Sequence, residues 1–250
     1  MRSDVELEFS TTLDDVADVN GWLRAEQARL LWDAARRLRP GSRIVEIGSF
    51  HGRSTVVLAR AAPPDVEIIA IDPHAGNDRG PLQWKGTSAE GQADFDQFRQ
   101  TLERTGVADR VRHVRLRSAD ALAEVAGTVQ LLYIDGAHGY GPALADLTGW
   151  GDRVAPGGTL VIHDAYLSVG VTCALARRLF FSRRFRFGGR SRSMVEYRRQ
   201  SIGGAEYVAN VARQLAPLPW FVRNTFVRLL LLAHLRPLAR LLGYRGDGLY

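Results

Sequence analysis

Cysteine and lysine are almost missing from this 250-residue sequence, which contains only Cys173 and Lys85. A single cysteine excludes an internal disulfide framework and a zinc site built from cysteines, and it favours a reducing cytoplasm as the location. Arginine therefore supplies nearly all of the positive charge behind the net charge of +6. The densest arginine cluster, residues 177–199, alternates with apolar residues typical of strands, and this pattern predicts no nucleic-acid partner.

The sequence also lacks a long uninterrupted apolar run. Its most apolar segment, residues 221–242, is broken by four arginines and by Pro237, whereas about 20 uninterrupted apolar residues are needed to cross a bilayer. The first six residues include Asp4 and Glu6, where a secretory signal would be apolar. Neither a transmembrane helix nor a signal peptide is therefore expected.

Periodicity divides the chain into three regions. Residues 1–41 are expected to be helical, with Pro40-Gly41 ending the pattern, and residues 42–200 alternate short aliphatic runs with helical stretches. Residues 201–250 are rich in apolar residues, arginine and proline, and we expect a helical appendix there. The residues at helical spacing in the first region are Trp22, Leu23, Leu30, Leu31, Ala34, Ala35 and Leu38.

The middle region has the pattern of a doubly wound α/β fold. Almost wholly apolar runs are typical of parallel strands that helices cover on both faces, and their alternation with helices implies right-handed crossovers. The last two runs leave no room for a helix between them, which predicts an antiparallel hairpin. The prediction is a Rossmann-like, mostly parallel, seven-stranded sheet. Expected strands are 44–47, 68–71, 111–116, 129–134, 159–162, 185–187 and 194–197, and expected helices are 54–62, 90–105, 119–125, 140–150 and 167–180.

A glycine-containing loop follows the first expected strand. In open α/β sheets, ligands bind beyond the carboxyl ends of the strands, so the loops there should carry the chemistry. Gly48 and Gly52 allow a tight turn and a close approach of backbone to ligand, and Ser54 is placed to cap the next helix. The Gly-x-x-x-Gly spacing is looser than the Gly-x-Gly-x-x-Gly of dinucleotide folds and suits a ligand without phosphates. An ordinary strand-to-helix turn explains the loop alone equally well.

Polar side chains also follow the second and third expected strands. Asp72 lies about 20 residues beyond the glycine turn, where a carboxylate accepts hydrogen bonds from a ribose diol. Ser118 could contact an adenine edge. Each has a structural alternative, since Asp72 could stabilise a turn and either Ser118 or Asp120 could cap a helix.

These motifs, in this order, resemble those of class I S-adenosylmethionine-dependent methyltransferases. The resemblance covers roughly residues 42–199 and rests on Glu46-x-Gly48-x-x-x-Gly52-x-Ser54 followed by acids and serine at successive strand ends. It implies that Gly48, Ser49 and Gly52 contact the methionine part, Asp72 the ribose and Ser118 the adenine. The whole cofactor-binding set it implies is Glu46, Gly48, Ser49, Phe50, Gly52, Ser54, Asp72, Ser118 and Asp135.

The fourth and fifth expected strands end in Asp135-Gly136-Ala137-His138 and in His163-Asp164. Two aspartates offer the oxygen ligands that a hard divalent cation such as Mg²⁺ or Mn²⁺ prefers, and a bound cation would acidify a substrate hydroxyl. His138 is the candidate base for the hydroxyl proton, and Asp135, His163 and Asp164 are the candidate metal ligands. Alternatively, His163 could bond a neighbouring loop and Asp164 could cap a helix. His51, His74 and His113 fit no pair and are treated as background.

This end of the site is similar to that of metal-dependent O-methyltransferases. In the type acting on macrolide sugars, a histidine follows the metal aspartate by three residues, as His138 follows Asp135 here. Two departures concern the second acid: the catechol type places asparagine where this chain has Ala165, and the sugar type places glutamate where it has His163. An imidazole ligand would shift preference toward softer ions such as manganese, iron or zinc.

The C-terminal region favours helices that pack on the domain or on a second copy of the chain. An interfacial membrane helix gathers its arginines on one face, whereas a single helix over this segment would place Arg223 and Arg228 on different sides. A homodimer is therefore expected. Peripheral membrane contact through residues 218–242, or a lid over an apolar substrate, is the alternative.

The sequence thus predicts a cytoplasmic, metal-assisted O-methyltransferase acting on a hydroxyl of a small molecule or glycosylated natural product. A metal-independent methyltransferase, in which His138 or His163 acts as the catalytic base on an oxygen or nitrogen acceptor, is a second hypothesis. A nicotinamide-dependent oxidoreductase is a third, and the missing Gly-x-Gly-x-x-Gly argues against it. A membrane-associated Rossmann-like protein without catalysis is the fourth.

Overall fold

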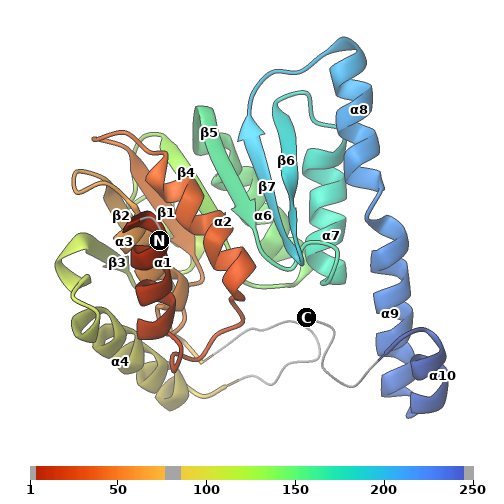
Figure 1. Ribbon diagram of the computed structural model, residues 1–250, viewed down its shortest axis with the longest axis horizontal. Coiled ribbons are helices and arrows are strands. Elements are labelled where there is room, and N and C mark those ends of the chain that lie inside the picture. The colour runs from red at the N-terminus through yellow and green to blue at the C-terminus, as the bar shows by residue number, and fades with distance from the viewer. Residues whose placement is uncertain (1–3, 77–85, 245–250) are drawn as a thin grey trace.

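The structure is a computed structural model that describes residues 4–76 and 86–244. The first and last predicted regions therefore extend, at residues 1–3 and 245–250, beyond the described chain, and Lys85 also lies outside it. Figure 1 shows a single twisted sheet with helices on both faces and a helical arm at the C-terminal side.

The predicted sheet is confirmed, with strand order β3-β2-β1-β4-β5-β7-β6. The first five strands in sequence run parallel, and the β6–β7 hairpin joins β5 antiparallel. The strands are β1 (Arg43–Ile47), β2 (Glu67–Ile71), β3 (Val111–Val114), β4 (Val129–Ile134), β5 (Val154–Ile162), β6 (Phe185–Ser191) and β7 (Met194–Arg199). β5 begins five residues earlier than predicted. The prediction missed this part of the strand because Ala155 to Gly158 have the composition of a turn, although they continue the strand next to a bulge in its pairing with β4.

Two hydrophobic cores flank the sheet. One lies between the sheet and α1–α4, and the other lies between the sheet and α5–α7, with the first residues of α9 packed against it. The helices are α1 (Asp4–Asp15), α2 (Ala25–Arg36), α3 (Arg53–Ala61), α4 (Ser88–Arg104), α5 (Ser118–Ala121), α6 (Tyr140–Gly149), α7 (Val169–Leu175), α8 (Gly204–Leu215), α9 (Leu218–Leu232) and α10 (Arg236–Leu241). A π-helical turn, Ala176–Phe180, continues α7, so the predicted helix 167–180 is present with a wider final turn.

The N-terminal region consists of two helices rather than one continuous helical run. α1 and α2 are joined by residues 16–24, and Trp22 and Leu23 lie in that connection, so their assignment to a helix is wrong. Leu23 is buried, whereas Trp22 is 52% exposed and stacks on Phe50 of the glycine loop with ring centroids 6.0 Å apart. The connection therefore lies against the loop that follows β1.

Three helices form the C-terminal region, as expected, but not as one rod. Tyr166 and Tyr197 donate hydrogen bonds to the backbone and side chain of Gln214, which fixes α8 to the sheet. The chain turns at residues 233–235 between α9 and α10, where His234 has φ 58°. In the described part of the chain, no helix combines the length and the apolar character that crossing a membrane requires.

Candidate active site

The carboxyl ends of the central strands are tied together by backbone hydrogen bonds. Asp135 N–H donates to Ile47 O (2.8 Å), which joins the ends of β4 and β1. His163 N–H donates to Ile134 O (2.9 Å), which joins the ends of β5 and β4. The loops after β1, β4 and β5 therefore start side by side at one edge of the sheet, as the parallel order requires.

The glycine loop fits tightly against the end of β4. Gly48 has φ +87°, and a Cβ added there would lie 2.2 Å from the carbonyl oxygen of Asp135. Gly52 has φ +86° and is the N-cap of α3. Only glycine meets the requirement at Gly48 for both a left-handed backbone and a close approach of two backbones. The loop therefore brings backbone N–H groups to the edge where the strands end.

Ser54 does not cap α3, contrary to expectation. The helix begins one residue earlier, and the Ser54 hydroxyl donates to Glu46 Oε1 (2.5 Å) while Thr55 donates to Oε2 (2.5 Å). Glu46 is fully buried, and burial raises its pKa to about 7 against the lowering effect of the two hydroxyl donors. Glu46 and Ser54 thus form a buried polar pair beneath the loop.

Asp72 lies where the ribose hypothesis needs it, and it also holds the glycine loop. Its Oδ2 accepts from Phe50 N–H and its Oδ1 from His74 N–H, both at 2.9 Å. Each carboxylate oxygen has a second lone pair, so these bonds leave capacity for a ligand hydroxyl. His74 Nε2 lies 2.8 Å from Phe50 O, so His74 also holds the loop.

Ser49 supplies an independent sign of a ligand. Its side chain is buried, and its hydroxyl has no hydrogen-bond partner among the residues that the structure describes. Buried hydroxyls are normally satisfied, because leaving one unpaired costs about 1–3 kcal/mol. Within a loop that already requires glycine for close approach, this hydroxyl fits a bound polar group such as the amino acid end of S-adenosylmethionine.

Ser118 does not cap a helix. The N-cap of α5 is Arg117, and the Ser118 hydroxyl instead donates to Asp146 of α6. The Ser118 carbonyl accepts from Trp150 Nε1 (2.9 Å). Burial raises the pKa of Asp146 to about 6, and the hydrogen bond from Ser118 opposes that rise. Contact with adenine stays a prediction for Ser118, whose hydroxyl is already engaged.

The predicted acids and imidazoles after β4 and β5 do come together. His138 Nε2 lies 2.7 Å from Asp164 Oδ2. His163 Nδ1 lies 3.3 Å from Asp135 Oδ1 and 3.4 Å from Asp164 Oδ1. His163 and Asp164 are buried, whereas the Asp135 and His138 side chains remain 29% and 24% exposed. The exposed pair therefore faces the side from which an acceptor can approach.

The charges of this cluster support one another. Burial alone would lower the pKa of His163, but Asp135 and Asp164 outweigh it and raise the pKa to about 10. Burial alone would raise the pKa of Asp164, but the two imidazoles hold it well below its usual range. Asp164 is therefore ionised at any physiological pH.

His163 is oriented by a residue from the N-terminal helix. Gln27 Nε2 lies 3.1 Å from His163 Nε2, and Gln27 Oε1 accepts from Arg24 N–H (3.0 Å). Because the amide oxygen is engaged, its nitrogen faces Nε2 of the ring, and Nδ1 is directed at the two acids. The two carboxylates beside Nδ1 favour a proton there. His163 thus meets the acids as a donor rather than through a free lone pair.

A metal ion fits a slightly different set of residues from the predicted one. Asp135, His138 and Asp164 each offer a ligand atom within 4.8 Å of the others, and His163 is not in this group. Two carboxylate oxygens and one imidazole nitrogen suit Mn²⁺ or a related ion. The donor set therefore fits the group that the resemblance implies.

Backbone strain is concentrated at the same edge. Among the described residues other than glycine, six have positive φ, and four of them follow β1, β2 or β5. These four are Phe50, His74, Asp164 and Tyr166. Such residues cost about 1–3 kcal/mol each and cluster at functional sites.

Three contributors were missed in the sequence. Tyr133 donates to Asp135 Oδ2 (2.9 Å), and its position two residues earlier on the same side of β4 was a usable signal. His51, treated as background, lies 2.8 Å from Asp94 Oδ1 of α4. Gln27 gave no signal, because its contact with His163 spans 136 residues. His113 packs with His74, Phe95 and Phe98, and burial lowers its pKa to about 4.

Comparison with known proteins agrees with this geometry. Residues 45–165 match the family model described as a methyltransferase domain. The O-methyltransferase NovP is similar over 79% of this chain and 100% of its own, with 15% identity and a TM-score of 0.63. TomG from Streptomyces achromogenes, an O-methyltransferase of tomaymycin synthesis solved with S-adenosylmethionine, is similar over 80% and 92%, with 20% identity and a TM-score of 0.53. An O-methyltransferase from Bacillus cereus, solved with S-adenosylhomocysteine, is similar over 79% and 91%, with 14% identity and a TM-score of 0.54.

The fold and the matched domain together define the class of protein. The seven-stranded sheet with its antiparallel hairpin is the methyltransferase fold, and the matched segment runs from β1 to the loop after β5. Residues 45–165 therefore form a methyltransferase domain, and the fold around them is that of S-adenosylmethionine-dependent methyltransferases.

Proposed function

We propose that this protein transfers the methyl group of S-adenosylmethionine to a hydroxyl oxygen of a small-molecule acceptor, with the help of a divalent cation. One observation carries the proposal: Asp135, His138 and Asp164 meet beside a glycine loop that contains the unsatisfied Ser49 hydroxyl. The O-methyltransferases named above support an oxygen acceptor.

The cofactor is assigned to the first two loops. Gly48, Ser49 and Gly52 would face its methionine part, and Asp72 would accept from the ribose hydroxyls while keeping its bonds to the loop backbone. Phe50 stacks between Trp22 and His51, so its ring belongs to this wall of the site. Glu46 and Ser54 act from beneath the loop.

Asp135 and Asp164 would hold the cation, which supplies Lewis acidity toward the acceptor hydroxyl. His138 would take the hydroxyl proton. Its Nε2 faces Asp164, so its other nitrogen can act as the base, much as a carboxylate orients a catalytic imidazole elsewhere. With S-adenosylmethionine bound, the acceptor oxygen would bond its methyl carbon as the carbon–sulfur bond breaks, and His138 would hold the hydroxyl proton.

A metal-independent reaction is the second candidate, and the His138–Asp164 pair favours it. This 2.7 Å contact by itself makes an acid-oriented base. In that case the oxygen or nitrogen acceptor would be activated by His138 alone. Either candidate reaction agrees with a cytoplasmic location. Cys173 is a free, exposed thiol, as is typical of a reducing compartment, and methyl transfer needs no oxidant.

The test combines cofactor binding with turnover. S-adenosylmethionine binding is measured by calorimetry, and S-adenosylhomocysteine formation is measured over a panel of sugar, phenol and polyketide hydroxyls with Mn²⁺ or with a chelator. Loss of turnover with the chelator supports the metal-assisted reaction, and unchanged turnover supports the second candidate. Failure to bind S-adenosylmethionine would overturn both.

His138→Asn separates the two roles of this residue. If His138 is the base, the variant keeps Mn²⁺ affinity and loses turnover by about 10²–10⁴-fold. If His138 is instead a ligand, Mn²⁺ affinity falls with the turnover. His234→Asn is a control, because His234 lies in the turn between α9 and α10 and not in the acid cluster.

A further inference from the structure

Helices α9 and α10 expose a continuous apolar surface. On α9, Asn224 and Val227 are buried on one side, while Val222, Phe226 and Leu229 lie exposed on the other at helical spacing. Exposed leucines continue from the end of α9 through the turn and along α10: Leu232, Leu235, Leu238, Leu241 and Leu242, of which Leu241 is 82% exposed. Exposed apolar surface of this extent marks an interaction site.

The same segment carries charge of only one sign. Residues 218–244 contain four arginines and neither aspartate nor glutamate, the arginines being Arg223, Arg228, Arg236 and Arg240. None of them forms an ion pair with another described residue; Arg223 and Arg228 donate to the backbone carbonyls of Leu242 and Leu167. Elsewhere arginines pair with acids, as Arg29 does with Glu6 and Asp33. The arm formed by α9 and α10 therefore combines an apolar surface with positive charges that no acidic side chain of the described residues neutralises.

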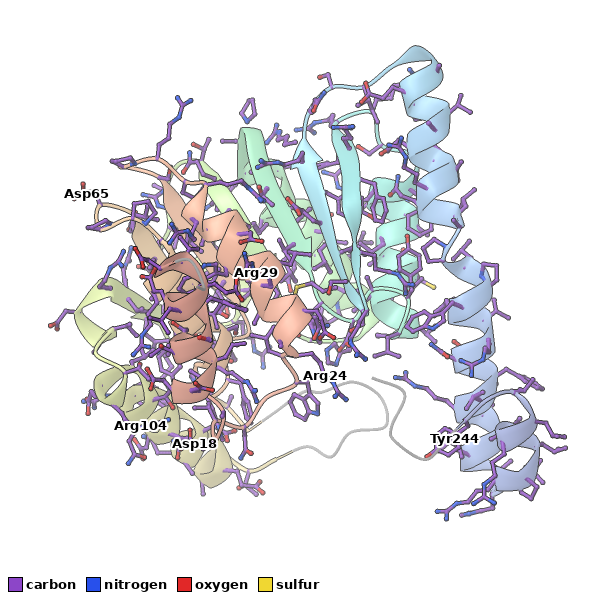
Figure 2. The ribbon with its side chains drawn as sticks, in the orientation of Figure 1. Asp18, Arg24, Arg29, Asp65, Arg104 and Tyr244 are labelled. Carbon is purple, nitrogen blue, oxygen red and sulfur yellow. The ribbon has the colours of Figure 1, made fainter. Side chains whose placement is uncertain are left out.

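The arm lies at the active-site end of the molecule. Arg228 bonds Leu167, three residues after Asp164, so α9 is attached directly to the loop that carries a candidate ligand. Figure 1 shows α9 and α10 extending past the carboxyl ends of the parallel strands. Figure 2 places Arg24, at the start of α2, and Tyr244, after α10, at this same end.

We propose that α9 and α10 dock the protein on an anionic lipid surface. The exposed leucines would enter the headgroup region, and the arginines would meet acidic headgroups, which is the combination that holds interfacial helices. A second copy of the chain fits this surface poorly, because a two-fold contact would set one group of unpaired arginines against another. An open groove between the helices, lined by Leu218, Pro219, Val222, Arg223, Phe226 and Leu242, gives an acyl chain a place to lie.

The arm consists of two helices, which changes how its arginines are grouped. On a single helix over residues 223–240 the arginines would fall on different sides. The turn at residues 233–235 folds α10 back, and Arg223 Nε reaches Leu242 O (2.8 Å) across the resulting pair. The arginines therefore belong to a two-helix unit, for which a single helical wheel gives the wrong grouping.

The experiment is cosedimentation of the full-length protein with vesicles of phosphatidylcholine alone or mixed with phosphatidylglycerol. Binding is expected only with the anionic vesicles and should weaken as salt is raised. Arg240→Glu should weaken binding about 30-fold, since each basic residue contributes about fivefold and the substitution reverses one charge. Leu241→Ser should weaken it about tenfold by removing apolar burial.

Matched controls lie on the remote surface. Arg39→Glu, an exposed residue after α2, and Leu7→Ser, an exposed residue of α1, should leave vesicle binding within twofold of the unaltered protein. Circular dichroism checks that each variant folds. Equal sedimentation with both vesicle types, or equal effects of Leu241→Ser and Leu7→Ser, would overturn the proposal. A dimer in solution that Leu241→Ser dissociates, without vesicle binding, would assign the surface to a second copy instead.

Discussion

Gln27 and His163 face each other across the active-site edge, with Gln27 Nε2 3.1 Å from His163 Nε2. The amide also donates to Ser193 Oγ (3.2 Å) in the β6–β7 turn. A buried polar chain thus runs from the hairpin, through the N-terminal helix α2, to the two acids. Helix α2 is therefore part of the site and not only a cover for the sheet.

Gln27→Met tests this connection, because methionine has a similar length and no polar hydrogen. The variant removes the partner of Arg24 N–H and the contact of Gln27 with His163 Nε2, so the free energy of unfolding should fall by about 1–3 kcal/mol. Mn²⁺ affinity should fall too, since outer partners orient ligands. Urea unfolding and metal titration measure both. Gln92→Met, at an exposed position of α4, should change the stability by less than about 0.5 kcal/mol; a similar loss in both variants would refute the connection.

Gly48→Ala is expected to destroy the cofactor loop. Its Cβ would meet the carbonyl oxygen of Asp135 at 2.2 Å, so the loop must move away from β4. Gly41→Ala is a matched control, since Gly41 also has a positive φ (+77°) but has open space around its Cβ position. Both variants should lose about 1 kcal/mol from backbone strain. Only Gly48→Ala should lose more than that and also lose calorimetric binding of S-adenosylmethionine. Equal binding by both would contradict the assigned role of the loop.

The sequence predicted the sheet and the edge where the site lies because both depend on local pattern. Runs such as Val129 to Ile134 are apolar since they are buried on both faces, and a residue following such a run must emerge at the strand end. Asp135 and Asp164 could therefore be placed together before any coordinates. Gln27 could not, because its contact is set by how α2 packs over the sheet. The roles of Ser54 and Ser118 could not be predicted either. A serine near the start of a helix can equally well cap the helix or donate its hydroxyl hydrogen to a buried carboxylate.

Glu46 makes stability depend on pH. Its pKa in the folded protein is raised from 4.5 to about 7, so the folded state holds a proton that the unfolded state releases. The contribution of Glu46 to the free energy of unfolding is fully present below pH 4.5. It is lost as the pH rises toward 7, and the loss is roughly 3 kcal/mol at most. Glu46→Gln should flatten this part of the profile in urea unfolding between pH 5 and 8. Glu67→Gln, at a half-exposed surface ion pair, should leave the slope unchanged; an unchanged slope in Glu46→Gln would exclude this source.

Ser118→Ala separates a structural role from a cofactor role. Removal of the hydroxyl takes away the donor that lowers the pKa of Asp146, so that pKa should rise further above 6. The free energy of unfolding should fall by about 1–3 kcal/mol. If the hydroxyl also contacts adenine, the Kd for S-adenosylmethionine should rise more than that for the methionine portion alone. An unchanged Kd beside reduced stability would leave Ser118 with the structural role only.

Asp164→Asn should remove cation binding while preserving the fold of the cofactor loop. The low pKa of Asp164 shows that its charge is held in place by His138 and His163, and asparagine keeps the shape but not the charge. Mn²⁺ affinity, followed by electron paramagnetic resonance, should fall more than tenfold, because a hard cation depends on anionic oxygen ligands. S-adenosylmethionine binding should stay within threefold. Asp152→Asn, which removes a surface acid paired with Arg178 and Arg184, should change neither measurement. Undiminished Mn²⁺ affinity in Asp164→Asn would show that the acids after β4 and β5 do not share a cation, and His138 would then have to act with Asp164 alone.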